Sequence, residues 1–114
     1  MPVRIGFTQF RREMLEKEME NIMSLLPQLG VEKVYLTGDM VTGDISPDSR
    51  IDLVVVHDTD GAFGRRADFF SYHLSSMVAV DCQVYTPQEF EELQDSLPAL
   101  ATAIKHGRVI YSAQ

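Results

Sequence analysis

The sequence predicts an α/β domain with a small mixed β-sheet and helices packed mainly on one face of that sheet. Two hydrophobic periodicities alternate along the chain: steps of three and four residues, typical of amphipathic helices, and steps of two, typical of strands. The resulting order is α-β-β-α-β-α-α-β, and short alternating elements of this kind favour one sheet covered by helices. A chain of 114 residues is long enough for one domain, which we expect to span residues 1–114.

The first helix is expected over residues 8–26. Its apolar stripe consists of Leu15, Met19, Ile22 and Leu26, at steps of four, three and four. This spacing places the four side chains on one helical face. Pro27 and Gly30 follow and end the helix.

The remaining elements follow the same two signals. A second helix is expected over residues 62–76, where Phe63, Ala67, Phe70, Leu74 and Met77 form the apolar stripe. Strands are expected over residues 31–37, 51–56, 78–85 and 109–111. Thr86 and Pro87 can begin a short helix, with Glu89 completing a capping box. A last helix is expected over residues 96–106 and ends at Gly107.

The charge and composition of the chain argue against non-specific binding to nucleic acid, an internal disulfide and association with membranes. The chain has 17 acidic and 10 basic residues, a net charge of -7, which opposes non-specific binding to nucleic acid. Its single cysteine, Cys82, cannot form an internal disulfide. Because no apolar stretch reaches membrane-spanning length, we expect a soluble, cytoplasmic protein that does not associate with membranes.

Carboxylates gather around a glycine turn in the stretch LTGDMVTGDISPDSRIDLVVV, residues 36–56. Strand residues two apart share a face, so Arg50 and Asp52 point away from the core, and Asp81 on a later strand can lie beside them. Paired carboxylates repel unless a cation or a proton joins them, and Mg²⁺ binds carboxylate, water and phosphate oxygens. Backbone N–H groups after Gly38 can bind phosphate. Together these features predict a site for phosphoryl or nucleotidyl transfer.

The same stretch resembles the signature of the minimal nucleotidyltransferases of the DNA polymerase beta superfamily, roughly L-F-G-S-x-A-x-G-x-x-x-x-x-S-D-h-D-L-h-V with h apolar. The matching positions are Leu36, Gly38, Gly43, Ser49, Ile51, Asp52 and Leu53. VDCQVYTPQEFEEL resembles the family's third carboxylate strand, with Asp81 as that carboxylate, and HGRVIY resembles its last strand. Together these segments cover residues 31–111.

The resemblance implies a nucleotidyltransferase fold and a two-metal reaction. In that reaction an NTP gives its nucleoside monophosphate to an acceptor and releases pyrophosphate. Asp52 and Asp81 would be the catalytic carboxylates and would hold Mg²⁺. Gly38, Asp39 and Ser49 would lie at the nucleotide phosphates.

Two positions depart from the family pattern. Asp39 stands where the family has serine, and Arg50 stands where it has the first metal-binding aspartate. We expect the Arg50 guanidinium to pair with Asp52, and with Asp81 or Asp39, where a metal ion would otherwise hold these carboxylates together. Mg²⁺ binding should then be weak and catalysis weakened or lost. Alternatively, Asp39 supplies the ligand that position 50 has lost.

Two classes of function remain open on this basis. The first is an enzyme that binds Mg-NTP and modifies a protein or a small acceptor. The second is a non-catalytic binding protein, because minimal domains of this family pair with small helical proteins of the HEPN type in toxin–antitoxin-like modules. A helical protein partner or a homo-oligomer is expected under either function.

Overall fold

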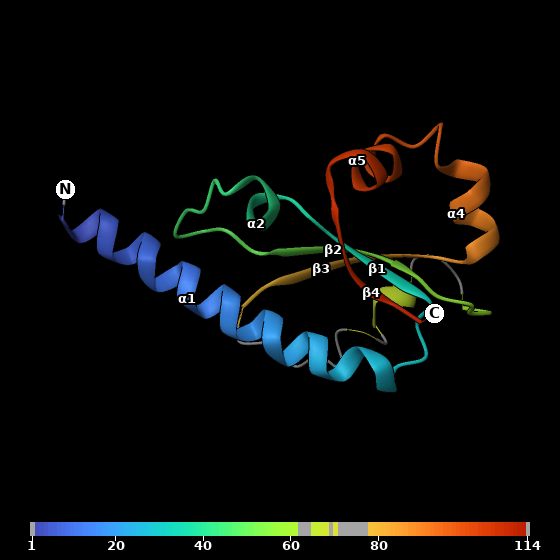
Figure 1. Ribbon diagram of the computed structural model, residues 1–114, viewed down its shortest axis with the longest axis horizontal. Coiled ribbons are helices and arrows are strands. Elements are labelled where there is room, and N and C mark those ends of the chain that lie inside the picture. The colour runs from blue at the N-terminus through green and yellow to red at the C-terminus, as the bar shows by residue number, and fades with distance from the viewer. Residues whose placement is uncertain (1, 62–64, 69, 71–77, 114) are drawn as a thin grey trace.

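A four-stranded mixed sheet forms the centre of the molecule in the computed structural model, which describes residues 2–61, 65–68, 70 and 78–113. The strands are β1 (Lys33–Thr37), β2 (Ile51–Val56), β3 (Val80–Tyr85) and β4 (Arg108–Ser112), in the order β3-β2-β1-β4. β2 pairs with β3 in parallel, and β1 pairs antiparallel with β2 and with β4. The predicted mixed α/β architecture is therefore confirmed (Figure 1).

One face of the sheet is covered by α1 (Pro2–Leu25) and the short 3-10 turn η1 (Leu26–Gln28). The predicted stripe is confirmed, because Leu15, Met19, Ile22 and Leu26 are all buried. They pack against inward-facing strand residues that include Val34, Leu36, Ile51, Leu53 and Val55. Neither α1 nor any other helix in the described ranges combines the length and the apolar character needed to cross a membrane.

Part of the opposite face is covered by α5 (Pro98–His106), with α4 (Pro87–Leu93) beside it (Figure 1). A second, smaller apolar cluster lies here, made of Tyr35, Val54, Val56, Tyr85, Leu100 and Ala103. Helices are thus more evenly divided between the faces than the sequence suggested. Because α4 and α5 pack at one end, the other end of this face stays open around Asp52 and Asp81.

The element boundaries differ slightly from the predicted ones. β2 spans its predicted range, whereas β1 and β3 each begin two residues later than predicted and α1 begins at Pro2. Of the predicted helix over residues 62–76, residues 65–68 and 70 are helical and Phe70 is buried. Phe63, Leu74 and Met77 lie outside the described residues.

α4 begins with the predicted capping box, which an arginine extends. The Thr86 hydroxyl accepts a hydrogen bond from the Glu89 N–H, and the Glu89 carboxylate accepts one from the Thr86 N–H. The same carboxylate accepts hydrogen bonds from both terminal nitrogens of Arg66, one at 3.1 Å. Arg66 also donates to the carbonyl oxygen of Val84, at 3.3 Å. One side chain therefore joins the start of α4 to the segment before β3.

The Glu89 carboxylate should make the free energy of unfolding depend on pH in the acidic range. Hydrogen bonds from Arg66, and then from the Thr86 N–H, hold the pKa of the Glu89 carboxyl at about 2, against an ordinary 4.5. A depressed folded-state pKa gives stability that is complete above about 4.5 and is lost as the pH falls toward about 2. The free energy of unfolding of the natural chain should therefore exceed that of Glu89→Gln by a constant amount near neutrality.

That difference should shrink steadily below pH 4.5. Urea denaturation at a series of pH values measures it for both proteins. Taking the difference removes the contribution of the other carboxylates. A difference that stays constant down to pH 3 would show that the Glu89 carboxylate gains nothing from these contacts.

Candidate functional site

Asp52 and Asp81 lie side by side because β2 and β3 are parallel and in register. The two residues are direct partners in that pairing. Neighbouring side chains at matched positions of a sheet share one face, and here it is the face opposite α1. Their side chains are 27% and 45% exposed, so solvent and ligands can reach both.

Gly38 brings the end of β1 against Asp52. Its φ of 76° and ψ of -152° lie in a region of backbone conformation that residues other than glycine rarely adopt. A Cβ atom at this position would lie 2.3 Å from Asp52 Oδ2, far inside contact distance. The chain then turns into α2 (Asp39–Thr42). Glycine is therefore required here for its backbone conformation and for the close approach of the carboxylate.

The Arg50 guanidinium bridges the two carboxylates. Arg50 Nε lies 3.2 Å from Asp52 Oδ1, and Nη2 lies 3.8 Å from Asp81 Oδ2. The Arg50 side chain is 57% exposed, so it approaches from the solvent side rather than from the core. The predicted ion-paired cluster thus forms with Asp52 and Asp81.

Burial is the strongest influence on the charge state of Asp52. It raises the pKa of the Asp52 carboxyl, and the charges of Asp81 and Asp39 act in the same direction, while the charge and hydrogen bond of Arg50 lower it. The Arg50 guanidinium therefore counteracts the two neighbouring carboxylates, and burial keeps the pKa above its ordinary value.

Asp39 and Ser49 bond to each other. The Ser49 hydroxyl donates to Asp39 Oδ2 at 2.7 Å and accepts from the Ser46 N–H at 2.8 Å. Ser49 is only 2% exposed, and Arg11 Nε on α1 donates to its carbonyl oxygen at 2.7 Å. These contacts fix the loop before β2 and so position Arg50. They also engage the Asp39 carboxylate, which weighs against its replacing the lost metal ligand.

A cavity of about 320 Å³ opens beside the carboxylates. Asp52, Asp81 and Gly38 line it on the sheet side, residues of α5 line it on the other, and the cavity is open to solvent. The additional lining residues that the sequence analysis did not identify are Thr37, Val54, Gln83, Pro98, Ala99 and Thr102. Gln83 could have been found, because it lies two residues after Asp81 on the same strand face. Asp39 and Ser49 are not among the described residues that line the cavity.

These residues do not fit the two-metal centre that the resemblance implies. Such a centre needs several carboxylates facing a common point, and in the described ranges no group of three or more His, Cys, Asp or Glu side chains is placed to hold a metal ion. The pair that remains, Asp52 and Asp81, is in contact with a cation of the chain itself.

The fold and these side chains define an α/β domain with paired carboxylates beside a glycine turn. The profile of the nucleotidyltransferase domain matches residues 13–111, and the chain belongs to that family. A solved structure described as the crystal structure of the toxin-antitoxin with AMP-PNP is similar, at 21% identity and a TM-score of 0.49, covering 83% of this chain and 73% of that one. No curated protein matches the sequence.

Proposed function

We propose that this nucleotidyltransferase domain has lost metal-dependent nucleotidyl transfer and acts as a binding protein, the partner of a small helical protein. The observation that carries the proposal is the bridge from Arg50 to Asp52 and Asp81, at 3.2 Å and 3.8 Å. The guanidinium takes the place of the dication that would otherwise hold the two carboxylates together.

Arg50 weakens metal binding through its charge. A guanidinium stays protonated throughout the accessible pH range, so it cannot yield its place by losing a proton. Two unit charges about 4 Å apart interact by about 1 kcal/mol in water, which makes about 2 kcal/mol of repulsion for a divalent ion. Since Arg50 is largely exposed, the interaction energy in water applies here, and not the larger energy of a buried charge pair. It corresponds to a loss of roughly thirtyfold in Mg²⁺ affinity.

The second candidate is an enzyme with weak activity. The cavity of about 320 Å³ beside Asp52, Asp81 and Gly38 favours it, because a polyphosphate could enter there. Arg50 is exposed enough to swing aside. In this candidate the chain would bind Mg-NTP and transfer the nucleoside monophosphate to an acceptor.

The melting temperature separates these candidates. A ligand that binds only the folded state must raise it, by an amount that grows with concentration. We expect no shift when Mg-ATP, Mg-GTP, Mg-CTP and Mg-UTP are added in turn. A clear shift with one nucleotide that disappears in Asp52→Ala would favour the enzyme.

A further inference from the structure

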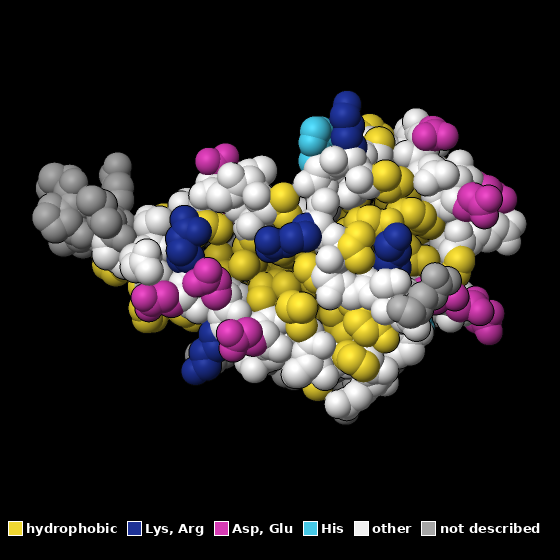
Figure 2. Space-filling model, in the orientation of Figure 1, with side chains coloured by type: hydrophobic (Ala, Val, Ile, Leu, Met, Phe, Trp, Pro, Cys, Tyr) yellow, Lys and Arg dark blue, Asp and Glu magenta, His cyan; other side chains and the backbone are white. Residues whose placement is uncertain are grey.

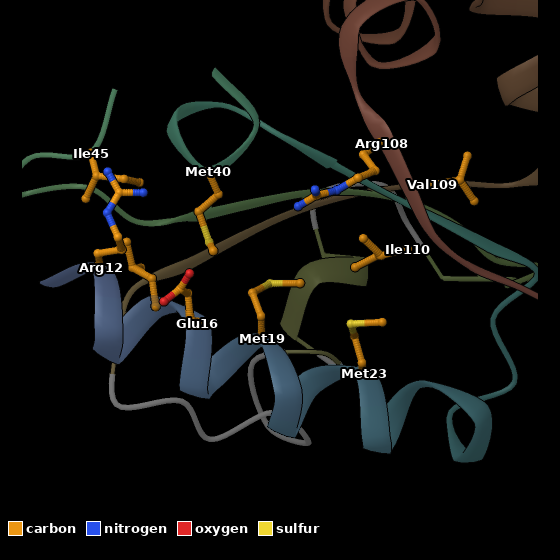
Figure 3. Close-up of a pocket in the computed structure, with 10 residues that line it drawn as sticks. Arg12, Glu16, Met19, Met23, Met40, Ile45, Arg108, Val109 and Ile110 are labelled. Atoms are coloured by element: carbon orange, nitrogen blue, oxygen red, sulfur yellow. The ribbon is translucent and has the colours of Figure 1, made fainter. Parts of the chain in front are cut away.

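An apolar groove with a basic lining lies apart from the carboxylate site. Its volume is about 490 Å³, and it shares no lining residue with the cavity beside Asp52. α1 forms one wall, α2 and the following loop form the second, and β4 forms the third (Figure 3). We propose that this groove binds an amphipathic helix of a partner protein, one whose polar flank is acidic.

The α1 wall has the spacing of a helix-binding surface. Arg12, Glu16, Met19 and Met23 point toward the groove at steps of four, three and four residues (Figure 3). They extend along about 16 Å of the helix, which matches about three turns of a partner helix. Such a row of ridges accepts the side chains of a second helix packed alongside.

The apolar side chains that line the groove can adapt to the side chains of a partner. Seven of the ten described lining residues are apolar, and three of those are methionines: Met19, Met23 and Met40. Methionine is unbranched and polarizable, so it adapts to the shapes of incoming side chains. Met23 and Val109 are 46% and 47% exposed, which leaves large apolar side chains in contact with solvent.

The charges in the groove indicate an acidic partner. Among the described residues that line it, Arg12 and Arg108 are basic and Glu16 is acidic, although the whole chain carries a net charge of -7. Arg108 extends from β4 across the groove toward Met40 (Figure 3). Figure 2 shows basic side chains within the apolar surface of this face and acidic ones around its margin. Acidic residues flanking the apolar face of a partner helix would meet these arginines.

A second copy of the chain fits the groove less well. Its longest helix, α1, buries its main apolar stripe against its own sheet. The large apolar side chains that the described part of α1 exposes before Met23, Phe7 and Phe10, span only one helical turn, which is shorter than the groove. Two copies would also bring together two chains of net charge -7. The proposed occupant is therefore a different protein.

Two designed peptides test the proposal directly. Both are three-turn helices with leucines at i, i+3, i+7 and i+11; one carries glutamates and the other lysines on the flanks. We expect the glutamate peptide to bind the natural chain about tenfold more tightly than the lysine peptide. The glutamates can form two charge pairs with the arginines of the groove, whereas the lysines would be repelled by them. Titrations followed by NMR shifts measure both affinities.

Three variants locate the site. Met23→Glu should weaken binding of both peptides about tenfold or more, because it places a charge on the apolar wall. Ile104→Glu is the matched control, since Ile104 is 44% exposed but lies on α5 across the sheet, and it should bind as the natural chain does. Arg108→Glu should abolish the preference for the glutamate peptide.

Three outcomes would overturn the proposal. They are equal affinity for the two peptides, a preference that survives Arg108→Glu, and no binding of either peptide. Self-association of the chain that Met23→Glu abolishes would assign the groove to a second copy and would also overturn it. The inference rests on the proposed function only for the expectation of a protein partner. The peptide titration and the nucleotide test therefore fail independently.

Discussion

Arg50→Asp is expected to convert the paired carboxylates into a metal-binding site. The variant removes the guanidinium that contacts Asp52 and Asp81 and sets a third carboxylate beside them. Three carboxylates in close proximity repel one another, so the metal-free variant should unfold at a lower temperature than the natural chain. Mn²⁺ or Mg²⁺ should bind the three and restore stability.

At a hundredfold excess over Kd, the metal should stabilise the variant by about 2.7 kcal/mol. For a domain of this size, that is a rise in Tm on the order of 10 °C. Arg50→Gln is the matched control, because it removes the cation without supplying a ligand. If Arg50→Asp gains no more stability from Mn²⁺ than Arg50→Gln, the two carboxylates are not held in a geometry that a metal can use.

Gly38→Ala is expected to be the most destabilising single change at the site. The backbone conformation of Gly38, at φ 76° and ψ -152°, costs other residues about 1–3 kcal/mol. The new methyl group would also meet Asp52 Oδ2 at 2.3 Å and force that side chain to move. We expect a total loss of about 2–4 kcal/mol, measured by urea denaturation.

Gly43→Ala separates the two causes. Gly43 also has a positive φ, 86°, but a Cβ there meets nothing within 4 Å, so the expected loss is about 1–2 kcal/mol. In an Asp52→Ala background, the loss of stability caused by Gly38→Ala should fall toward the part that comes from the backbone conformation alone. An unchanged cost in that background would mean that the contact between Gly38 and Asp52 is energetically unimportant.

Much of this site follows from strand periodicity. β2 is predicted over its full length because the segment Ile51–Val56 consists of apolar residues and Asp52, with no glycine or proline among them. The placement of Asp52 beside Asp81 follows from one assumption, that both lie on the outward face of neighbouring strands, and the register confirms it. The contact of Arg50 with both carboxylates follows in turn, since residues two apart share a face.

Other features depend on contacts that no local pattern reveals. The hydrogen bond from Ser49 to Asp39 joins residues ten positions apart through a loop, and Arg11 anchors that loop from a distant helix. The second apolar cluster is not evident from the sequence, because Val54 and Val56 alternate with the core residues of β2 and share a strand face with Asp52. Only the packing of α5, through Leu100 and Ala103, determines how much of that face is covered.

Titration of the natural chain with Mn²⁺, followed by electron paramagnetic resonance, examines most directly whether Arg50 has replaced a metal ion. We expect only weak binding that Asp52→Ala leaves nearly unchanged, because the carboxylates already have a cation of their own. Tight, stoichiometric binding of Mn²⁺ that disappears in Asp52→Ala would mean that the guanidinium moves aside and that the metal site survives.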